Sequence, residues 1–519
     1  MTHNLHPILK MITGTLCSRI LGLLRDTVFF TILGSGMQAS AFLIAFAIPN
    51  LFRRLCGEGA LNSAFIPVFA QRLVHQKSSS GHFLNLFFSR VNIYLGVGIL
   101  VSMGLLYCLQ TYAPIHHRWE TVINLTCIML PYLWFICLAA LYNGALNVLN
   151  AFSLTAFSPI LLNVFMLLGL GISTRFESDQ TRILIVSFGV VVGGFFQWYF
   201  PRNQLKGLKA WQPKFCWQLD QDLQRIWWLF IPSVLGAAIF QINTLLGRLL
   251  AFSIDEQAVS LLYLSNRFLE LPLGLFAFAI ISVLLPQLSL CEAQHKSKEA
   301  NTILQNSLHL LLTLLLSASV GLFLLAEPIL NLFFCWGKFS IKDVQAAVPL
   351  LKIFAIGLPF FGLTALLTRV FYAHKDTKTP VRIALYVLIL YLITALSCIH
   401  LYKAAGLALA SILSTIAQFL FLWHILAKRY THYQLKLMPL IAKKVPCILL
   451  LGTFVYIASR WLPIESQKIE TCFLLSIIIT LSVLIYGFSL FFMDNRAFKC
   501  LQAILRLKTP KMHVTSSKD

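Results

Sequence analysis

The chain has 519 residues, of which 58% are hydrophobic and only 12% are charged. A soluble domain carries about 25% charged residues, so this composition excludes a soluble protein and predicts one immersed in lipid. The net charge of +22 would suit nucleic-acid binding only if basic side chains covered a soluble face, and the sequence offers no such segment. We therefore attribute the basic excess to the positive-inside rule and expect no nucleic-acid partner.

Apolar runs long enough to cross a bilayer recur along the whole chain. A transmembrane helix needs about 20 residues, and by that measure there are fourteen runs, the second interrupted by Pro49 and Pro67. They lie near residues 8–33, 37–70, 83–108, 121–149, 155–173, 181–200, 226–252, 258–290, 305–330, 344–372, 380–400, 404–427, 441–462 and 469–493. The first run is too long for the apolar core of a signal peptide, so we expect it to remain a membrane helix. The pattern predicts an all-α fold, a polytopic bundle of about 14 transmembrane helices.

The basic residues in the loops predict the orientation of these helices. An even number of spans places both termini on one side, and on that side Lys and Arg outnumber those in the opposite loops by about three to one. The connection from Lys428 to Lys444 and the tail beyond residue 493 are especially basic. We therefore expect a bacterial inner-membrane protein with both termini in the cytoplasm and the loops near Arg118 and Arg175 in the periplasm.

Charged residues inside the apolar runs mark the candidate binding site. Each costs about 2.5–3.5 kcal/mol at the centre of a membrane helix, so a chain keeps many of them only where they face one another or a wet cavity. At about 100° per residue they share one sector of each helix with small or polar residues. The candidate substrate-binding residues are Arg19, Arg25 and Asp26 in the first run, Arg53, Arg54 and Glu58 in the second, and Arg267 and Glu270 in the eighth.

These clusters have two interpretations. Arginines outnumber acids in the set, and the rigid guanidinium fork suits phosphate oxygens, so the surplus positive charge favours an anion site. Alternatively, each acid neutralises a neighbouring arginine, and the clusters only hold helices together. The sequence leaves this second interpretation open for Arg25 with Asp26 and for Arg54 with Glu58.

Motifs for enzyme chemistry are absent from the sequence. It contains no G-x-x-x-x-G-K-[ST] phosphate loop, no nucleophile elbow and no acid-rich motif for a metal-bound nucleotide sugar. The cysteines lie mostly inside apolar runs, and the adjacent His116 and His117 lack a partner at metal-ligand spacing. We therefore expect a transporter and not an enzyme, with no catalytic residues, no cofactor and no metal site.

Several segments carry a family resemblance. They read SRILGLLRD from Ser18, GSGMQASAF from Gly34, IPNLFRRLCGEGALNSAFIPVF from Ile48, SNRFLELPLGLF from Ser265 and YAHKDTKTPV from Tyr372. Together with the fourteen spans, they closely resemble the MurJ (MviN) family of lipid II flippases, within the multidrug/oligosaccharidyl-lipid/polysaccharide exporter superfamily. The resemblance covers nearly the whole chain.

The resemblance implies a domain organisation and a substrate. It implies two six-helix lobes, residues 1–200 and 226–427, around a central cationic cavity. Two additional helices in 441–493 would form a groove for a polyprenyl tail, and residues 494–519 would be a basic cytoplasmic tail. The implied substrate is lipid II, the undecaprenyl-pyrophosphate-linked disaccharide pentapeptide of peptidoglycan biosynthesis. Membrane lipids and other cell-wall synthesis proteins are the further partners that it implies.

The resemblance also assigns roles to residues. Family arginines that matter for function fall on Arg19, Arg25, Arg53 and Arg267, and family acids fall on Glu58 and Glu270. The chain departs from the family at four positions, where Ser40 replaces an acid, Ala47 a basic residue, Gly247 an aspartate and Ala395 an asparagine. Because the last two are implied sodium ligands, we expect the membrane potential to drive transport, at about 2.3 kcal/mol per charge per 100 mV.

Three alternative functions remain open from the sequence. The first is export of another lipid-linked polysaccharide precursor or of a small molecule. The second is a membrane glycosyltransferase, which would need a catalytic acid cluster and usually a large outer loop. The third is a non-transporting scaffold for cell-wall synthesis, which would have no need of buried arginines.

Overall fold

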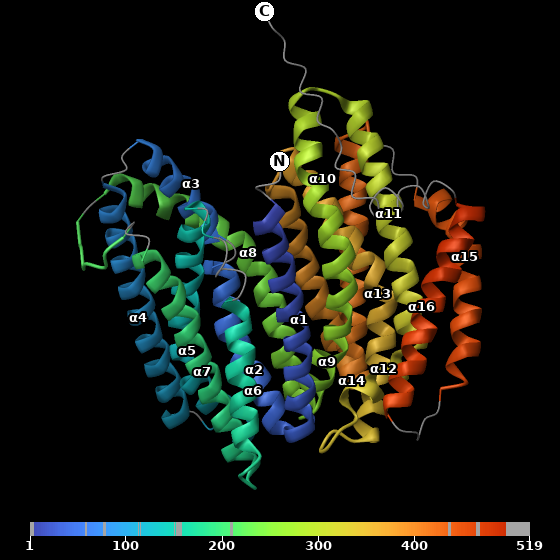
Figure 1. Ribbon diagram of the computed structural model, residues 1–519, viewed down its shortest axis with the longest axis horizontal. Coiled ribbons are helices and arrows are strands. Elements are labelled where there is room, and N and C mark those ends of the chain that lie inside the picture. The colour runs from blue at the N-terminus through green and yellow to red at the C-terminus, as the bar shows by residue number, and fades with distance from the viewer. Residues whose placement is uncertain are drawn as a thin grey trace, which may run out of the picture. The chain divides into compact units, whose positions relative to one another are not determined.

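The computed structural model describes residues 5–57, 60–75, 79–112, 114, 116–149, 151, 158–207, 211–218, 220–433, 437–462 and 468–494. Every regular element within these ranges is a helix, as Figure 1 shows, which confirms the predicted all-α fold. The chain forms two compact units. Unit 1 comprises residues 1–261 and 333–343, and unit 2 comprises residues 262–332 and 344–519.

The helices follow the predicted runs closely. Up to residue 254 they are α1 (Leu5–Leu33), α2 (Met37–Phe52), the π-helical turn η2 (Arg53–Gly57), α3 (Ala60–His75), α4 (Ser80–Tyr112), α5 (His117–Val148), α6 (Ser158–Ser173), α7 (Asp179–Gly207) and α8 (Gln221–Ile254). Beyond it they are α9 (Ala258–Pro272), the π-helical turn η4 (Leu273–Ala277), α10 (Phe278–Ala293), α11 (Ser297–Leu324), α12 (Ala326–Phe334), α13 (Ile341–Ala373), α14 (Lys378–Arg429), α15 (Leu437–Ser459) and α16 (Lys468–Met493).

Some runs differ from simple single helices, and two places show the cause. The run 37–70 divides into α2, η2 and α3, because Pro49 has no backbone N–H and disturbs the helical hydrogen bonds around it. The runs 380–400 and 404–427 join in α14, which is interrupted at Lys403, where φ is 48° and ψ is −127°. A Cβ on Gly406 would lie 2.4 Å from the carbonyl oxygen of Cys398. Only glycine therefore permits the close backbone approach at this junction.

The length and surface of the helices identify a multi-pass membrane protein. Nine helices in the described part of the chain are long and apolar enough to cross a membrane. Their outer faces carry large apolar side chains: Leu100 on α4 is 70% exposed and Phe488 on α16 is 68% exposed. Contiguous apolar exposure of this kind is stable in lipid, where the backbone polar groups are satisfied inside each helix.

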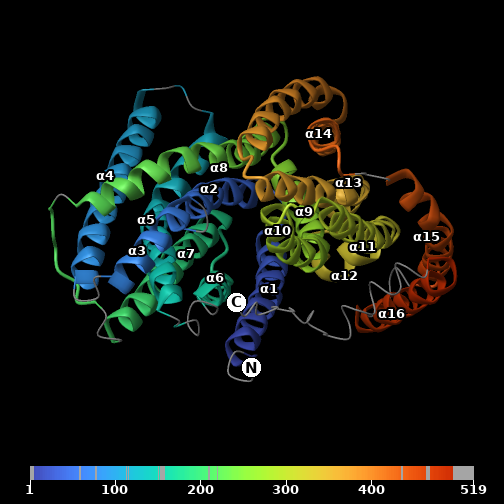
Figure 2. The same ribbon diagram turned by 90° about the horizontal axis from the view of Figure 1, so that it is seen from above.

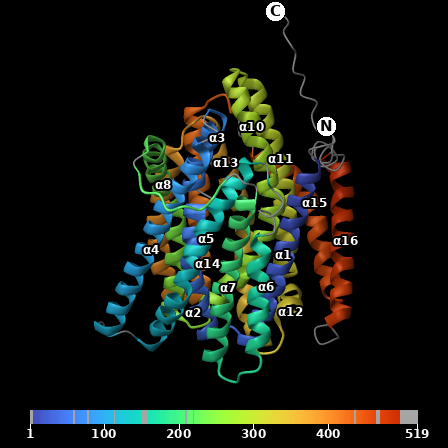
Figure 3. The ribbon, with the colours of Figure 1, turned by 60° about the vertical axis from the view of Figure 1, so that its left-hand side comes forward.

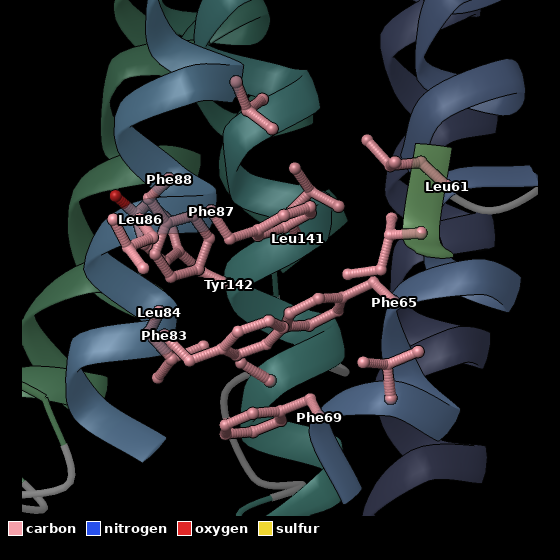
Figure 4. Packing of buried hydrophobic residues seen from close by; sticks show 14 of the residues in the cluster. Leu61, Phe65, Phe69, Phe83, Leu84, Leu86, Phe87, Phe88, Leu141 and Tyr142 are labelled. Atoms are coloured by element: carbon pink, nitrogen blue, oxygen red, sulfur yellow. The ribbon is translucent and has the colours of Figure 1, made fainter. Parts of the chain in front are cut away.

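The core of unit 1 contains a cluster of stacked aromatic rings, shown in Figure 4. Phe65 of α3 stacks on Phe87 of α4, with ring centroids 4.5 Å apart and planes 10° from parallel. Phe69 and Phe83 stack against Phe65 from the same two helices. Leu141 of α5 is fully buried in the same cluster. The aromatic spacing along α3 and α4 thus fixes how these helices pack on α5.

Glycines let α6 and α7 approach closely within unit 1. The two helices run side by side in Figure 3 and are packed against each other. A Cβ on Gly189 would lie 2.9 Å from the carbonyl oxygen of Phe165, and one on Gly193 would lie 3.2 Å from the Cα of Leu162. Small residues at such crossings are the usual way in which membrane helices gain packing contacts.

Residues 333–343 pack with unit 1, although the chain on either side of them belongs to unit 2. The backbone N–H of Lys338 donates to the carbonyl oxygen of Thr31, 2.9 Å away, and Ser35 Oγ donates to Asp343 at 2.6 Å. Gly337 has a φ of +55°, and a Cβ there would lie 2.4 Å from the Thr31 oxygen. A glycine is therefore required where this segment meets the end of α1.

The last two helices contact the rest of unit 2 through buried charges. α15 and α16 lie side by side in Figure 2, and α15 also packs on α11. The Lys444 side chain is fully buried, and its Nζ lies 3.0 Å from Asp494 Oδ2 and donates to Thr313 Oγ1 at 2.5 Å. His309 Nε2 lies 3.1 Å from the same carboxylate oxygen. The distribution of basic residues predicts that Lys444 lies in a cytoplasmic loop, whereas it lies inside α15.

The boundary between the compact units differs from the predicted boundary between lobes. The predicted first lobe ends at residue 200, whereas unit 1 continues to Leu261 and includes α8. α8 packs on α2 and α3, and Arg72 of α3 pairs with Asp220, the N-cap of α8, at 2.7 Å. The compact units do not test the predicted lobes, so the division into two six-helix lobes stays a prediction.

Candidate functional site

The first charged cluster lies in the interface between α1 and α6. Arg25 and Asp26 are buried, with 8% and 4% of their surfaces exposed, and their side chains pair at 2.5 Å. Arg25 Nη1 also donates to Asn163 Oδ1 at 3.1 Å, and Asn163 Nδ2 donates to the carbonyl oxygen of Ser18 at 3.2 Å. An anion that approaches Arg25 must therefore compete with Asp26 for the guanidinium.

Arg19 has a different environment on the same helix. It is half-buried, and its neighbours Ile20 and Leu24 are 60% and 49% exposed. Among the described residues, no carboxylate pairs with Arg19 and no side chain or carbonyl accepts a hydrogen bond from it. Its positive charge therefore remains available to an anion.

The second cluster lies on the π-helical turn η2. Arg53 and Arg54 are its first two residues; Arg53 is half-buried and Arg54 is exposed. Their predicted acidic neighbour Glu58 lies outside the described residues, so the predicted Arg54–Glu58 pair stays a prediction. Such π turns are common at functional sites, because the extra residue redirects side chains away from the regular helix face.

The third cluster lies on α9 in unit 2. Arg267 Nη1 pairs with Glu270 Oε2 at 3.2 Å, but the two side chains are 26% and 50% exposed. Exposed pairs of this kind contribute about 0–1 kcal/mol, so Glu270 holds Arg267 only weakly. Pro272 ends α9 and η4 follows at once. Each unit thus carries candidate arginines at a π turn that follows a proline, Arg53 and Arg54 in unit 1 and Arg267 in unit 2.

Other cations inside the apolar runs have structural partners. Arg248 of α8 donates to the carbonyl oxygen of Leu43 at 2.9 Å, and Arg90 donates to the carbonyl oxygen of Gln218 and lies over the Trp217 ring. Lys352 and Arg369 lie over the rings of Phe323 and Tyr372, with the charges 5.6 and 5.5 Å from the ring centroids. Hydrogen bonds and cation–π contacts account for keeping these four residues in the membrane without a substrate.

The family departures also have structural consequences. Ser40 is fully buried in unit 1, and its Oγ lies 2.9 Å from Ser260 Oγ. Ala395 is fully buried in α14 and has no side-chain oxygen. At these positions the chain has a neutral serine pair and an apolar contact in place of an acid and an amide.

The segment from Tyr372 to Val381 has a clear structural role. Asp376 accepts hydrogen bonds from the backbone N–H and the Oγ1 of Thr379, at 3.0 and 2.7 Å, and pairs with Arg429 at 2.6 Å. Burial opposes ionisation of Asp376, but these hydrogen bonds and Arg429 together lower its pKa. The pair therefore stabilises the start of α14 at neutral pH, and this contribution is lost as the pH falls through the carboxyl pKa.

Sequence reasoning missed the charged cluster of Lys444, His309 and Asp494. Each residue taken alone looks like an end-of-helix or loop charge, since the three positions come from α15, α11 and the end of α16. A weak signal existed, because Lys444 precedes the apolar residues of its run by less than one helical turn.

A bundle of long apolar helices, broken at prolines beside arginines, defines a multi-pass membrane transporter. The fold is similar to that of an inward-facing multidrug resistance MATE family transporter of the MOP superfamily, with a TM-score of 0.65 at 14% identity over 78% of this chain and 93% of that one. A structure titled lipid II flippase MurJ, inward closed conformation, has a TM-score of 0.77 at 25% identity over 92% of this chain and 97% of that one.

The sequence comparisons identify the family. The family described as lipid II flippase MurJ matches residues 29–490. A probable lipid II flippase MurJ of Haemophilus influenzae is 32% identical over 513 residues, which are 93% of this chain and 98% of that protein. One of Vibrio cholerae is 33% identical over 77% of this chain and 78% of that protein. The chain belongs to the lipid II flippase MurJ family, and it is a transporter and not an enzyme.

Proposed function

We propose that this protein flips lipid II from the inner to the outer leaflet of the bacterial cytoplasmic membrane by alternating access. The main observation in support of the binding site is that acidic residues neutralise its arginines to different extents. Arg25 is paired with a buried acid, whereas Arg19 has no acidic partner among the described residues and the Glu270 that pairs with Arg267 is half-exposed. A diphosphate offers negative charge and oxygens that suit guanidinium groups.

The π turns support a moving site. Arg53 and Arg54 lie on η2, and Arg267 lies just before Pro272 and η4. Broken helices at corresponding positions of two repeats commonly form binding sites in secondary transporters, because they can bend without losing many hydrogen bonds. We propose that both turns flex when the site changes the side of the membrane to which it opens.

We further propose that α15 and α16 accompany the polyprenyl tail. Their outer faces are apolar, with Phe473 67% and Val483 66% exposed, and such faces suit lipid chains. The Lys444 cluster holds α15 against α11. Both termini are proposed to be cytoplasmic, from the distribution of basic loops, and other cell-wall synthesis proteins are proposed as further partners.

Depletion of this protein in its own host is expected to leave lipid II on the inner leaflet. The measurement is cleavage of lipid II in intact cells by an added lipid II-degrading enzyme that cannot cross the membrane. Cleavage should fall as the protein is depleted, because lipid II then stays on the inner leaflet, and it should return when the gene is expressed again. Lipid II that stays equally accessible after depletion would refute the proposed function.

Transport is expected to depend on membrane potential more than on sodium. Gly247 and Ala395 have no side-chain oxygen for the ion, whereas a potential of 100 mV contributes about 2.3 kcal/mol per charge moved, about 50-fold in the equilibrium distribution. In proteoliposomes, replacing sodium by choline at a constant potential should leave lipid II transport unchanged, and collapsing the potential should reduce it. Loss of transport on sodium removal alone would contradict this.

A further inference from the structure

Three potential metal ligands meet at one end of unit 2, away from the arginines. Glu292 is the penultimate residue of α10, His374 directly follows α13, and His432 lies in the connection after α14. One ligand atom from each residue lies within 4.8 Å of the other two. Two imidazoles and one carboxylate form a ligand set that zinc commonly uses in proteins.

The distances between the ligand atoms fit a tetrahedral ion. Glu292 Oε2 lies 3.3 Å from His374 Nδ1, and Glu292 Oε1 lies 3.5 Å from His432 Nε2. Zinc binds nitrogen and oxygen at about 2.0–2.2 Å, so neighbouring ligand atoms in a tetrahedral site lie about 3.3–3.5 Å apart. Each distance therefore matches the separation of two ligand atoms around an ion, one measured to each oxygen of the Glu292 carboxylate.

Hydrogen bonding leaves Nδ1 of His374 as the ring nitrogen that faces the other proposed ligands. Tyr433 Oη donates its single proton to Glu292 Oε1 at 3.0 Å and lies 3.2 Å from His374 Nε2. Tyr433 can then only accept from the Nε2–H of His374, which leaves a lone pair on Nδ1 of the neutral ring, facing the Glu292 carboxylate. Two facing lone-pair donors repel unless a proton or a metal ion lies between them, and a bound metal removes this conflict.

His432 Nε2 lies 3.5 Å from Glu292 without forming a hydrogen bond. Its Nε2 is buried, yet no atom in the described part of the chain forms a hydrogen bond with it. The His374 ring is held in place by Tyr430, which stacks on it at 3.9 Å.

We propose that Glu292, His374 and His432 bind a zinc ion that ties the connection after α14 to the ends of α10 and α13. The fourth coordination position is left for water. This connection leads directly to α15, so the ion anchors the start of the two added helices to the rest of unit 2. Because the residues belong to three separate segments, no spacing motif in the sequence reveals them.

Zinc binding is tested on the purified full-length protein in detergent, with accessible thiols alkylated and metal removed. Calorimetric titration with zinc alone should show one saturable site, lost after His374→Ala or His432→Ala, with at least about a tenfold fall in affinity. His295→Asn is the matched control. This exposed imidazole lies three residues beyond Glu292, and asparagine tolerates its φ of 55°. The control should bind zinc as the unmodified protein does.

A second measurement keeps the test independent of variant folding. Cobalt(II), added to the unmodified protein in place of zinc, should give the intense visible absorption of a tetrahedral site, and zinc should displace it. The absence of saturable zinc binding, or equal binding by the His374→Ala/His432→Ala double variant, would overturn the proposal. Neither experiment uses lipid II, so each outcome is separate from the outcome for the proposed transport.

Discussion

Replacing Arg19 or Arg267 with alanine is expected to abolish transport while the protein still reaches the membrane in normal amount. Arg19 has no acidic partner among the described residues, and the Glu270 that pairs with Arg267 is half-exposed, so loss of the Arg267–Glu270 pair leaves no buried acid uncompensated. Loss of one charge-assisted hydrogen bond to a diphosphate, about 1.5–3 kcal/mol, lowers transport by about 10- to 150-fold. Complementation and lipid II exposure are measured beside protein level, with Arg175→Ala in an exposed loop as the control.

Substitution by lysine separates charge from geometry at the same positions. Lysine keeps the positive charge but cannot form the bidentate fork, so partial transport is expected where charge dominates. Arg25 should behave differently from Arg19, because Arg25→Ala leaves Asp26 buried, at a cost of about 3–5 kcal/mol. The protein level should therefore fall for Arg25→Ala and recover for Arg25→Ala/Asp26→Asn, while transport remains lost in both.

Paired removal of acid and base decides between the two interpretations of the clusters. If Arg267 serves only to neutralise Glu270, the Arg267→Ala/Glu270→Ala variant should transport normally, and the same holds for Arg53→Ala/Glu58→Ala. If Arg53 and Arg267 bind the substrate, both double variants should stay inactive at normal protein level. Normal transport by the doubles would mean that these arginines are structural and that the proposed substrate site is wrong.

The Lys444→Met variant is expected to lose about 3–5 kcal/mol of stability, because it leaves the Asp494 carboxylate buried without its ammonium partner. Lys444 and Asp494 are 0% and 5% exposed. Thermal denaturation in detergent measures the effect, and Lys443→Met is the control, since the adjacent Lys443 is exposed.

The double variant Lys444→Met/Asp494→Asn should recover most of this loss, because it removes both buried charges. His309 lies 3.1 Å from Asp494 and can supply part of the missing charge in the single variant. A Lys444→Met protein as stable as Lys443→Met would show that this cluster does not hold α15 on α11.

The lengths and positions of the helices could be predicted from the sequence. The fourteen apolar runs correspond to α1–α16 with small shifts at their ends, because a helix in lipid satisfies its own backbone and needs only local apolar composition. The break inside the run 37–70 was visible at Pro49 for the same local reason. The boundary between the predicted runs 380–400 and 404–427 coincides with the non-helical backbone at Lys403, where two helices meet within α14.

The charged residues show the same difference between what the sequence predicts and what the tertiary structure decides. The arginines of α1, η2 and α9 were found from the sequence, because a charge inside an apolar run is costly wherever its partner lies. The partners themselves were decided by the tertiary structure. Asn163 contacts Arg25 from α6, Asp494 and His309 meet Lys444, and Glu292 meets two histidines from distant segments. Such pairs depend on which helix faces pack together, and periodicity within one helix carries no information about the helix that it will face.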